Sequence, residues 1–232
     1  MKCCIYQVKI AFPSTLLPSP TTGALGSSTQ LLTSPKNNKA FFDVAFSGPL
    51  LGGIASLGTL VYGLQQTLQV RSNEIAALPH VPLDFLKLSS LTSATIESLM
   101  GTDVLLSIDP PSDNVAVHPM VIAGHVGILV NALALLPTRY TSDGGRMLRG
   151  AFSRFSVAVR AAQPLFVLFL VVQAFRDWET SSMLALYLFI GGACDDNVDV
   201  PCRNDVDPAG GLRIALFVAS ALVAAIAVSP AF

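Results

Sequence analysis

Long apolar stretches without a single charged residue dominate the hydrophobic pattern of this chain. Val44–Val70 and Asn114–Thr138 are each longer than the roughly 20 residues that an α-helix needs to cross the hydrocarbon core of a bilayer. A third stretch, Ile214–Phe232, is close to that length. The pattern therefore predicts three membrane helices in these ranges.

Two shorter charge-free stretches follow one another in the second half of the chain. They are Ala161–Phe175 and Thr180–Cys194, and only the four residues Arg176–Glu179 separate them. We interpret the pair as a tight helical hairpin. The predicted fold is thus an all-α multipass membrane protein with about five membrane helices.

The amino-terminal segment also has few charges, but its pattern is not helical. Prolines recur among many Ser and Thr residues between Ile10 and Pro35. Proline removes a backbone donor and breaks helices, and lipid cannot replace the lost hydrogen bonds. We therefore expect residues 1–40 to form an irregular or β segment with a short hairpin near Thr22–Leu32. A re-entrant course shielded by other protein is one option for it. Residues 41–232 are expected to form the membrane-embedded helical domain.

Composition supports the assignment to a membrane. Hydrophobic residues make up 52% of the chain, charged residues only 12%, and the mean hydropathy is +0.59. Soluble domains carry about 25% charged residues. The formal net charge of −1 offers no basic surface, so we expect no nucleic-acid partner. Four cysteines are too few for a disulfide scaffold.

Two of the predicted loops differ in charge. Loop 138–160 holds five arginines against the single acid Asp143, whereas loop 71–113 is acidic. The positive-inside rule predicts that the arginine-rich loop faces the cytoplasm, or the stroma of a plastid. Within the acidic loop, Leu83–Met100 has a loose helical period that predicts an interfacial helix.

Small residues recur along the first predicted membrane helix. Gly48, Gly52, Ala55 and Thr59 fall on one helical face, and small side chains let a second helix approach closely. Pro49 is expected to kink this helix. The face predicts helix packing and names no chemistry.

The sequence Asp143-Gly144-Gly145-Arg146 follows the second predicted membrane helix. One interpretation is structural, because glycines permit a sharp turn and Asp143 could cap the next helix. The other is chemical, because an ionisable residue at the edge of a membrane helix is a functional candidate. The residues themselves leave both open.

In combination, the motifs resemble the site-2 protease family of intramembrane zinc metalloproteases. The resemblance is closer to its plant and algal plastid branch, the ethylene-dependent gravitropism-deficient and yellow-green proteins, and it extends over about residues 22–213. The matching motifs, in chain order, are Thr22-Gly23-Ala24-Leu25-Gly26 with Thr29-Gln30, Ser47-Gly48-Pro49, His118-Pro119 with Ala123-Gly124, Pro137, Asp143-Gly144-Gly145-Arg146 and Pro201-Cys202-Arg203-Asn204-Asp205-Val206.

The resemblance implies a zinc ion held by two His of an HExxH helix and by one later Asp, with the Glu of that motif as general base. Asp143 matches the later Asp ligand. The segment around Gly26, Ser27 and Thr29 matches a β hairpin beside the zinc and is expected to hold the substrate in extended form. The implied partners are the transmembrane segments of membrane proteins and the lipid bilayer. The implied location is a plastid membrane, thylakoid or envelope.

The chain departs from the family at its metal site. Its three histidines, His80, His118 and His125, do not begin an HExxH motif. We therefore assign no catalytic residue and expect no stoichiometric zinc in this chain alone. His118 and His125 are expected to be an interfacial histidine and a histidine packed inside the bundle. Ala134 stands where the family tends to have Asn, and Ser142 stands where Leu usually precedes the Asp.

Two explanations of the missing motif stay open. The chain is either the core of a metalloprotease whose HExxH helix lies upstream, or a non-proteolytic relative that binds or assists membrane proteins.

Overall fold

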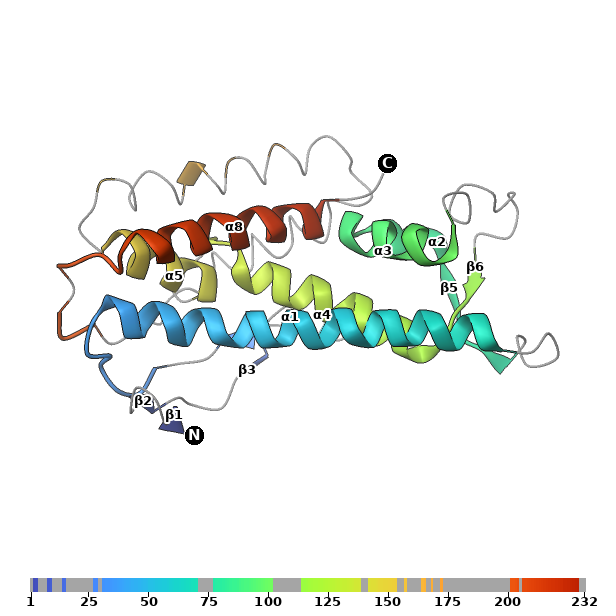
Figure 1. The fold of residues 1–232 in the computed structure, drawn as a ribbon, viewed down its shortest axis with the longest axis horizontal. Coiled ribbons are helices and arrows are strands. Elements are labelled where there is room, and N and C mark those ends of the chain that lie inside the picture. The colour runs from blue at the N-terminus through green and yellow to red at the C-terminus, as the bar shows by residue number, and fades with distance from the viewer. Residues whose placement is uncertain are drawn as a thin grey trace. The chain divides into compact units, whose positions relative to one another are not determined.

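The computed structural model describes residues 31–70, 77–101, 114–138, 142–153, 201–204 and 206–229, with the backbone of four short strands in the first 28 residues and a few isolated helical residues between 157 and 172 (Figure 1). Two compact units share these residues. Unit 1 comprises Met1–Pro49 and Leu133–Ala224, and unit 2 comprises Leu50–Ala132 and Ala225–Phe232.

Helices form most of the described structure. They are α1 (Asn38–Gln69), α2 (Leu83–Lys87), α3 (Ser90–Met100), α4 (Pro119–Leu135), α5 (Asp143–Phe152) and α8 (Gly211–Val228). The strands form antiparallel pairs: β1 (Lys2–Cys3) with β2 (Val8–Lys9), β3 (Ser14–Thr15) with β4 (Ser27–Ser28), and β5 (His80–Pro82) with β6 (Asn114–Ala116).

The helical character of the three longest apolar stretches is confirmed, but five membrane helices are not. Among the described residues, α1 and α8 are long and apolar enough to cross a membrane, whereas α4 has only 17 residues. Within the charge-free range Asn114–Thr138, the helix covers Pro119–Leu135, close to the start that His118-Pro119 indicates, and Asn114–Ala116 pairs as a strand with His80–Pro82. The predicted hairpin over residues 161–194 lies outside the described residues.

Both long helices leave most of their apolar surface uncovered. Only 17% of the most apolar window of α1 and 22% of that of α8 is buried. Leu51 and Leu222, for example, are 67% and 61% exposed. The core helix of a soluble protein would instead be mostly buried, so these surfaces suit an apolar solvent.

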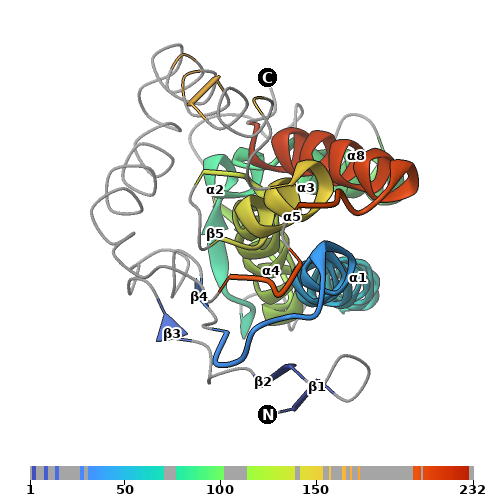
Figure 2. The same cartoon turned by 90° about the vertical axis from the view of Figure 1, so that its left-hand side faces the viewer.

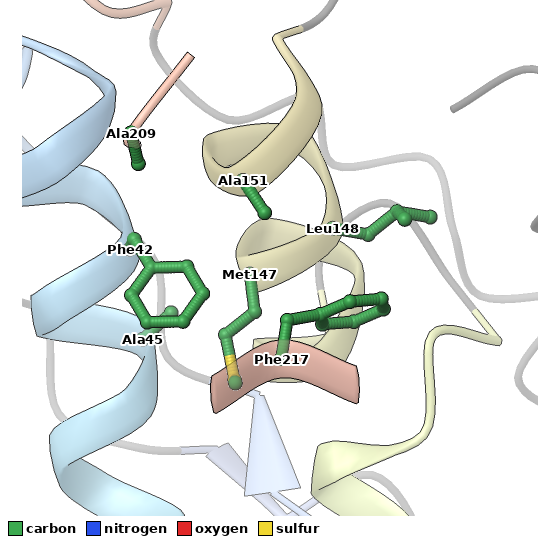
Figure 3. Packing of buried hydrophobic residues seen from close by; sticks show 7 residues of the cluster. All are labelled: Phe42, Ala45, Met147, Leu148, Ala151, Ala209 and Phe217. Atoms are coloured by element: carbon green, nitrogen blue, oxygen red, sulfur yellow. The ribbon is translucent and has the colours of Figure 1, made fainter. Parts of the chain in front are cut away.

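Unit 1 is built around α5. A buried cluster joins Phe42 and Ala45 of α1, Met147, Leu148 and Ala151 of α5, Ala209, and Phe217 of α8 (Figure 3). The end-on view in Figure 2 shows α5 beside α8. Phe152 of α5 and Phe217 also meet edge to face, with their ring centroids 6.1 Å apart. This packing fixes the helix that begins with Asp143.

In unit 2, the rest of α1 packs antiparallel against α4 through glycines. A Cβ at Gly124 would lie 2.4 Å from the Leu60 nitrogen, one at Gly127 2.3 Å from Ser56 Oγ, and one at Gly52 2.3 Å from Asn131 Oδ1. The side chains at these positions are absent or small, so the backbones approach closely.

The predicted small-residue face was therefore right at Gly52 and wrong at two of its other positions. Gly48 meets no described atom that a Cβ would touch, and Ala55 is exposed. The face that packs on α4 is rotated towards Ser56, Leu60 and Gly63. A single helix offers several small-residue faces, and its partner decides which is used.

The helix predicted over Leu83–Met100 is present as two helices. Ser89 separates α2 from α3, and its side chain accepts a hydrogen bond from the Thr92 N–H, which makes it the N-cap of α3. Thr92, Ser93 and Ile96 are buried. One face of α3 is thus covered by protein.

Candidate functional site

The candidate site centres on Asp143, the first residue of α5. Ser142 is the N-cap of this helix: its Oγ accepts a hydrogen bond of 3.0 Å from the Gly145 N–H and donates one of 3.2 Å to the Leu136 carbonyl. The suggestion that Asp143 caps the helix was therefore wrong, because the preceding serine does so. A carboxylate in the first helical turn is stabilised by the helix dipole.

Gly144 explains why a glycine follows the aspartate. A Cβ at this position would lie 2.1 Å from the Leu135 carbonyl oxygen and 2.5 Å from its carbon. The first turn of α5 thus lies directly against the last residues of α4, and no side chain fits between them. The turn through Pro137 and this contact fix the position of Asp143.

The charge beside Asp143 is positive. Arg146, whose side chain is only 4% exposed, lies with its Nη1 3.3 Å from Asp143 Oδ1. The Asp143 side chain keeps 24% of its surface exposed. The carboxylate is therefore held by a cation on one side and remains accessible on another.

The described residues do not by themselves fit a zinc ion. They contain no group of three or more His, Cys, Asp or Glu side chains placed to hold a metal. A catalytic zinc needs three protein ligands, and the guanidinium of Arg146 opposes a cation at the same carboxylate. Asp143 can serve as one ligand only if other ligands are supplied.

Two other predicted site residues, His118 and Pro119, have a structural role at the start of α4. His118 precedes α4: its N–H donates to Thr67 Oγ1 at 3.0 Å, and its Nδ1 accepts from the Met120 N–H. Pro119 is the first residue of α4, a position that suits its missing N–H. Both residues fix the start of a helix.

The remaining predictions have different outcomes. Pro49 lies inside α1, which continues through it. Gly145 is buried in the first turn of α5. Ser27 lies in β4, paired with Thr15 of β3, whereas Gly26 and Thr29 lie outside the described residues. No described contact tests the proposed substrate edge.

His125 is a buried residue of unit 2. Its Nδ1 lies 3.0 Å from Thr92 Oγ1, and its ring packs edge to face on Phe85 at 4.6 Å between centroids. The expectation of a histidine packed inside the bundle is confirmed. The contact joins α4 to α2 and α3.

Sequence reasoning missed the polar contacts around the start of α1. Asp43 forms an ion pair with Arg213 through two hydrogen bonds of 2.8 Å, and Asn38 Nδ2 donates to the Asp207 carbonyl at 2.7 Å. One signal was available: Asp43 and Arg213 each stand directly before a charge-free stretch. Nothing in the sequence indicated that they meet.

Comparison with known proteins finds relatives that are named as probable chloroplastic zinc metalloproteases. The chain is 29% identical over 97% of its length to rice "Probable zinc metalloprotease EGY1, chloroplastic". It is 25% identical, also over 97% of its length, to rice "Probable zinc metalloprotease EGY3, chloroplastic". It spans 36% and 38% of the length of these relatives. The resemblance drawn from the motifs is confirmed.

A third relative has a different kind of name. The chain is 29% identical over 60% of its length to the Arabidopsis "DDT domain-containing protein PTM", of which it covers 8%. No protein-family model matches the chain, and no solved structure matches it.

Proposed function

We infer, from the relationship of this chain to the plastid branch of the site-2 protease family, that it is the membrane-embedded core of an intramembrane zinc metalloprotease. The supporting observation is the match over 97% of the chain to a protein named as a zinc metalloprotease, together with a part-exposed Asp143 at a glycine-fixed helix start. Its substrates would be transmembrane segments of plastid membrane proteins.

In this proposal, Asp143 supplies one zinc ligand. The other two would come from an HExxH helix, a motif that these 232 residues do not contain. The described residues would orient Asp143: Ser142 caps α5, Gly144 brings it against α4, and Arg146 forms an ion pair with the carboxylate.

The exposed apolar surfaces of α1 and α8 support a location in the membrane. The word "chloroplastic" in the names of the relatives favours a plastid membrane. The substrate would be held in extended form at Gly26, Ser27 and Thr29, because an added strand satisfies backbone groups that lipid cannot. Proline in place of Ser27 should then block cleavage without changing zinc content.

A non-proteolytic role is the second candidate. It is favoured by the ion pair between Asp143 and Arg146 and by the absence of a metal-binding group among the described residues. Such a protein would bind or assist membrane proteins without cutting them.

The test joins an HExxH helix from a relative to the amino end of this chain and measures zinc content and cleavage of a transmembrane peptide. One zinc per chain and cleavage, both lost on Asp143→Asn but kept on Asp84→Asn, support the protease. Zinc content that is independent of Asp143 contradicts the role of Asp143 as a ligand. A folded protein that binds the peptide without zinc or cleavage supports the non-proteolytic role.

A further inference from the structure

A chain of polar contacts in unit 1 links the start of α1 to the end of α5. The guanidinium of Arg213, at the start of α8, donates from Nε and Nη2 to the two carboxylate oxygens of Asp43 in α1, each at 2.8 Å. Its Nη1 lies 3.5 Å from the Ala209 carbonyl oxygen. The Ala209 N–H in turn donates to the Gly150 carbonyl of α5 at 3.1 Å.

The segment before α8 is bound to the residues before α1. We call residues 201–204 and 206–210 the strap. The Arg203 N–H donates to the Pro35 carbonyl at 3.0 Å and the Asn204 N–H to the Lys36 carbonyl at 3.3 Å. Ser34 Oγ also donates to the Pro201 carbonyl. The strap is thus tied at one end to residues 34–36 and at the other to α5.

The end of α5 lies close against the start of α1. A Cβ at Gly150 would lie 3.1 Å from the Asn38 carbonyl oxygen and from the Phe42 Cβ. Phe42 belongs to the buried cluster, as does Phe217 (Figure 3). Asp43 directly follows Phe42, and Arg213 precedes Phe217 by one helical turn. The ion pair therefore lies beside the packing that holds α5.

The geometry of the ion pair makes it more than a surface contact. The Arg213 and Asp43 side chains are only 28% and 25% exposed. Two parallel N–H···O bonds fix the orientation of both partners, which a lysine could not reproduce. Exposed single-bond ion pairs contribute little, but a bidentate, partly covered pair restrains the helices that carry it.

We propose that Asp43 and Arg213 are positioning residues for Asp143: their ion pair holds α1 and α8 on α5 and so fixes the helix that presents the Asp143 carboxylate. This role rests on the proposed function of Asp143 as a ligand. The residues themselves touch neither metal nor substrate in the proposal.

The test is amide hydrogen exchange on the detergent-purified 232-residue protein, which requires neither zinc nor cleavage. The variants are Asp43→Asn, Arg213→Gln, Arg213→Lys and the charge-reversed double Asp43→Arg with Arg213→Asp. Lys39→Gln is the matched control, because Lys39 is an exposed charge one turn earlier on α1. Peptides over α5 report on the proposal, and peptides over α3 in unit 2 report on general unfolding.

We expect both neutralising variants to raise exchange in α5 about tenfold, a change typical of losing an interaction of one to two kcal/mol. Exchange in α3 should stay at the control level. Arg213→Lys should be intermediate, and charge reversal should restore part of the protection. Unchanged α5 exchange, or an equal rise in α3, overturns the proposal. If a neutralising variant does not fold, Arg213→Lys and the charge-reversed protein decide.

A final comparison separates this proposal from the proposed function. In the protein with an added HExxH helix, Asp43→Asn should weaken zinc binding while leaving Asp143 in place, and charge reversal should restore it in part. The unmutated fusion could protect the α5 amides from exchange and still bind no zinc. This result contradicts the proposed metalloprotease and leaves the effect of the ion pair on α5 standing. Zinc binding that is unchanged by Asp43→Asn contradicts the positioning role but not the proposed function.

Discussion

Glycines lie at close contacts between α1 and α4, but the glycines of these helices differ in how much space surrounds them. Gly124 faces the Leu60 backbone, and a Cβ there would come within 2.4 Å of the Leu60 nitrogen and 2.6 Å of its Cα. Gly58 meets no described atom within 4 Å. Position 124 therefore has no room for a side chain, whereas position 58 does.

Gly124→Ala should destabilise the protein by about 1–3 kcal/mol, because backbone atoms cannot move aside for the new methyl group. Gly58→Ala is the control and should be neutral or stabilising by up to about 1 kcal/mol, since alanine favours a helix over glycine. Thermal unfolding in one detergent measures both. Equal melting temperatures for the two variants would contradict the close approach of α4.

The Asp143 carboxylate lies beside the buried Arg146 and has one face exposed. We expect the purified 232-residue protein to hold far less than one zinc per chain, because one carboxylate beside a guanidinium does not make a three-ligand site. Elemental analysis measures this. One zinc per chain that disappears in Asp143→Ala would contradict this prediction and show that further ligands join Asp143.

The helix α3 differs from an ordinary interfacial helix because part of its buried face is polar. Thr92 and Ser93 are buried there, and Thr92 bonds to His125 of α4. At its start, the Ser90 N–H and Oγ both lie 2.8 Å from the Ser229 carbonyl oxygen that follows α8. The amino end of one helix thus satisfies the carboxyl end of another.

Thr92→Val should cost about 1–3 kcal/mol, because it leaves the buried His125 Nδ1 without its partner. The double variant Thr92→Val with His125→Leu should cost less than the sum of the two single variants, since neither polar group is then left alone. Chemical unfolding of the four proteins completes the cycle. Simple additivity would show that the hydrogen bond is not formed.

Part of the arginine-rich loop 138–160 forms α5, and this changes how its arginines are used. Arg146 is buried, and Arg149 lies 5.0 Å from the centroid of the Phe41 ring. At least these two arginines are used inside the protein and do not form a free basic surface. The positive-inside argument therefore rests on fewer charges than the sequence offers.

For the whole molecule, the two ends of α8 have different partners. Its start is bonded to Asp43 near the start of α1, and Ser229 beyond its end is bonded to Ser90 in the acidic segment. An 18-residue helix is about 27 Å long, close to the thickness of the bilayer core. The ends of α8 would then face opposite sides of a membrane.

Cysteines in place of Lys39 and Val206 should react with an impermeant thiol reagent from one side of sealed vesicles, and a cysteine in place of Ser98 should react from the other. All three positions are exposed, and the natural cysteines are replaced by Ser beforehand. The physical reason is that a membrane-spanning α8 has its two ends in water on opposite sides of the bilayer. Labelling of all three from the same side would contradict a membrane-spanning α8.

The sequence by itself determined the long helices and the resemblance to plastid zinc metalloproteases. Charge-free stretches identify α1 and α8 because burying charge in lipid is costly along the whole length, and the resemblance drawn from the ordered motifs agrees with relatives that are named as chloroplastic zinc metalloproteases. These properties are local or linear along the chain. The N-cap at Ser142 was also a local signal, although Asp143 competed for it.

Tertiary structure alone decided which groups meet. It chose Ser56, Leu60 and Gly63 over Gly48 and Ala55 as the packed face of α1. It also joined Asp43 to Arg213, 170 positions away, and covered Arg146. Apolar and small residues surround α1 on all sides, so its sequence pattern does not say which face finds a partner. Ion pairs between distant helices depend on how the chain returns, which no local pattern records.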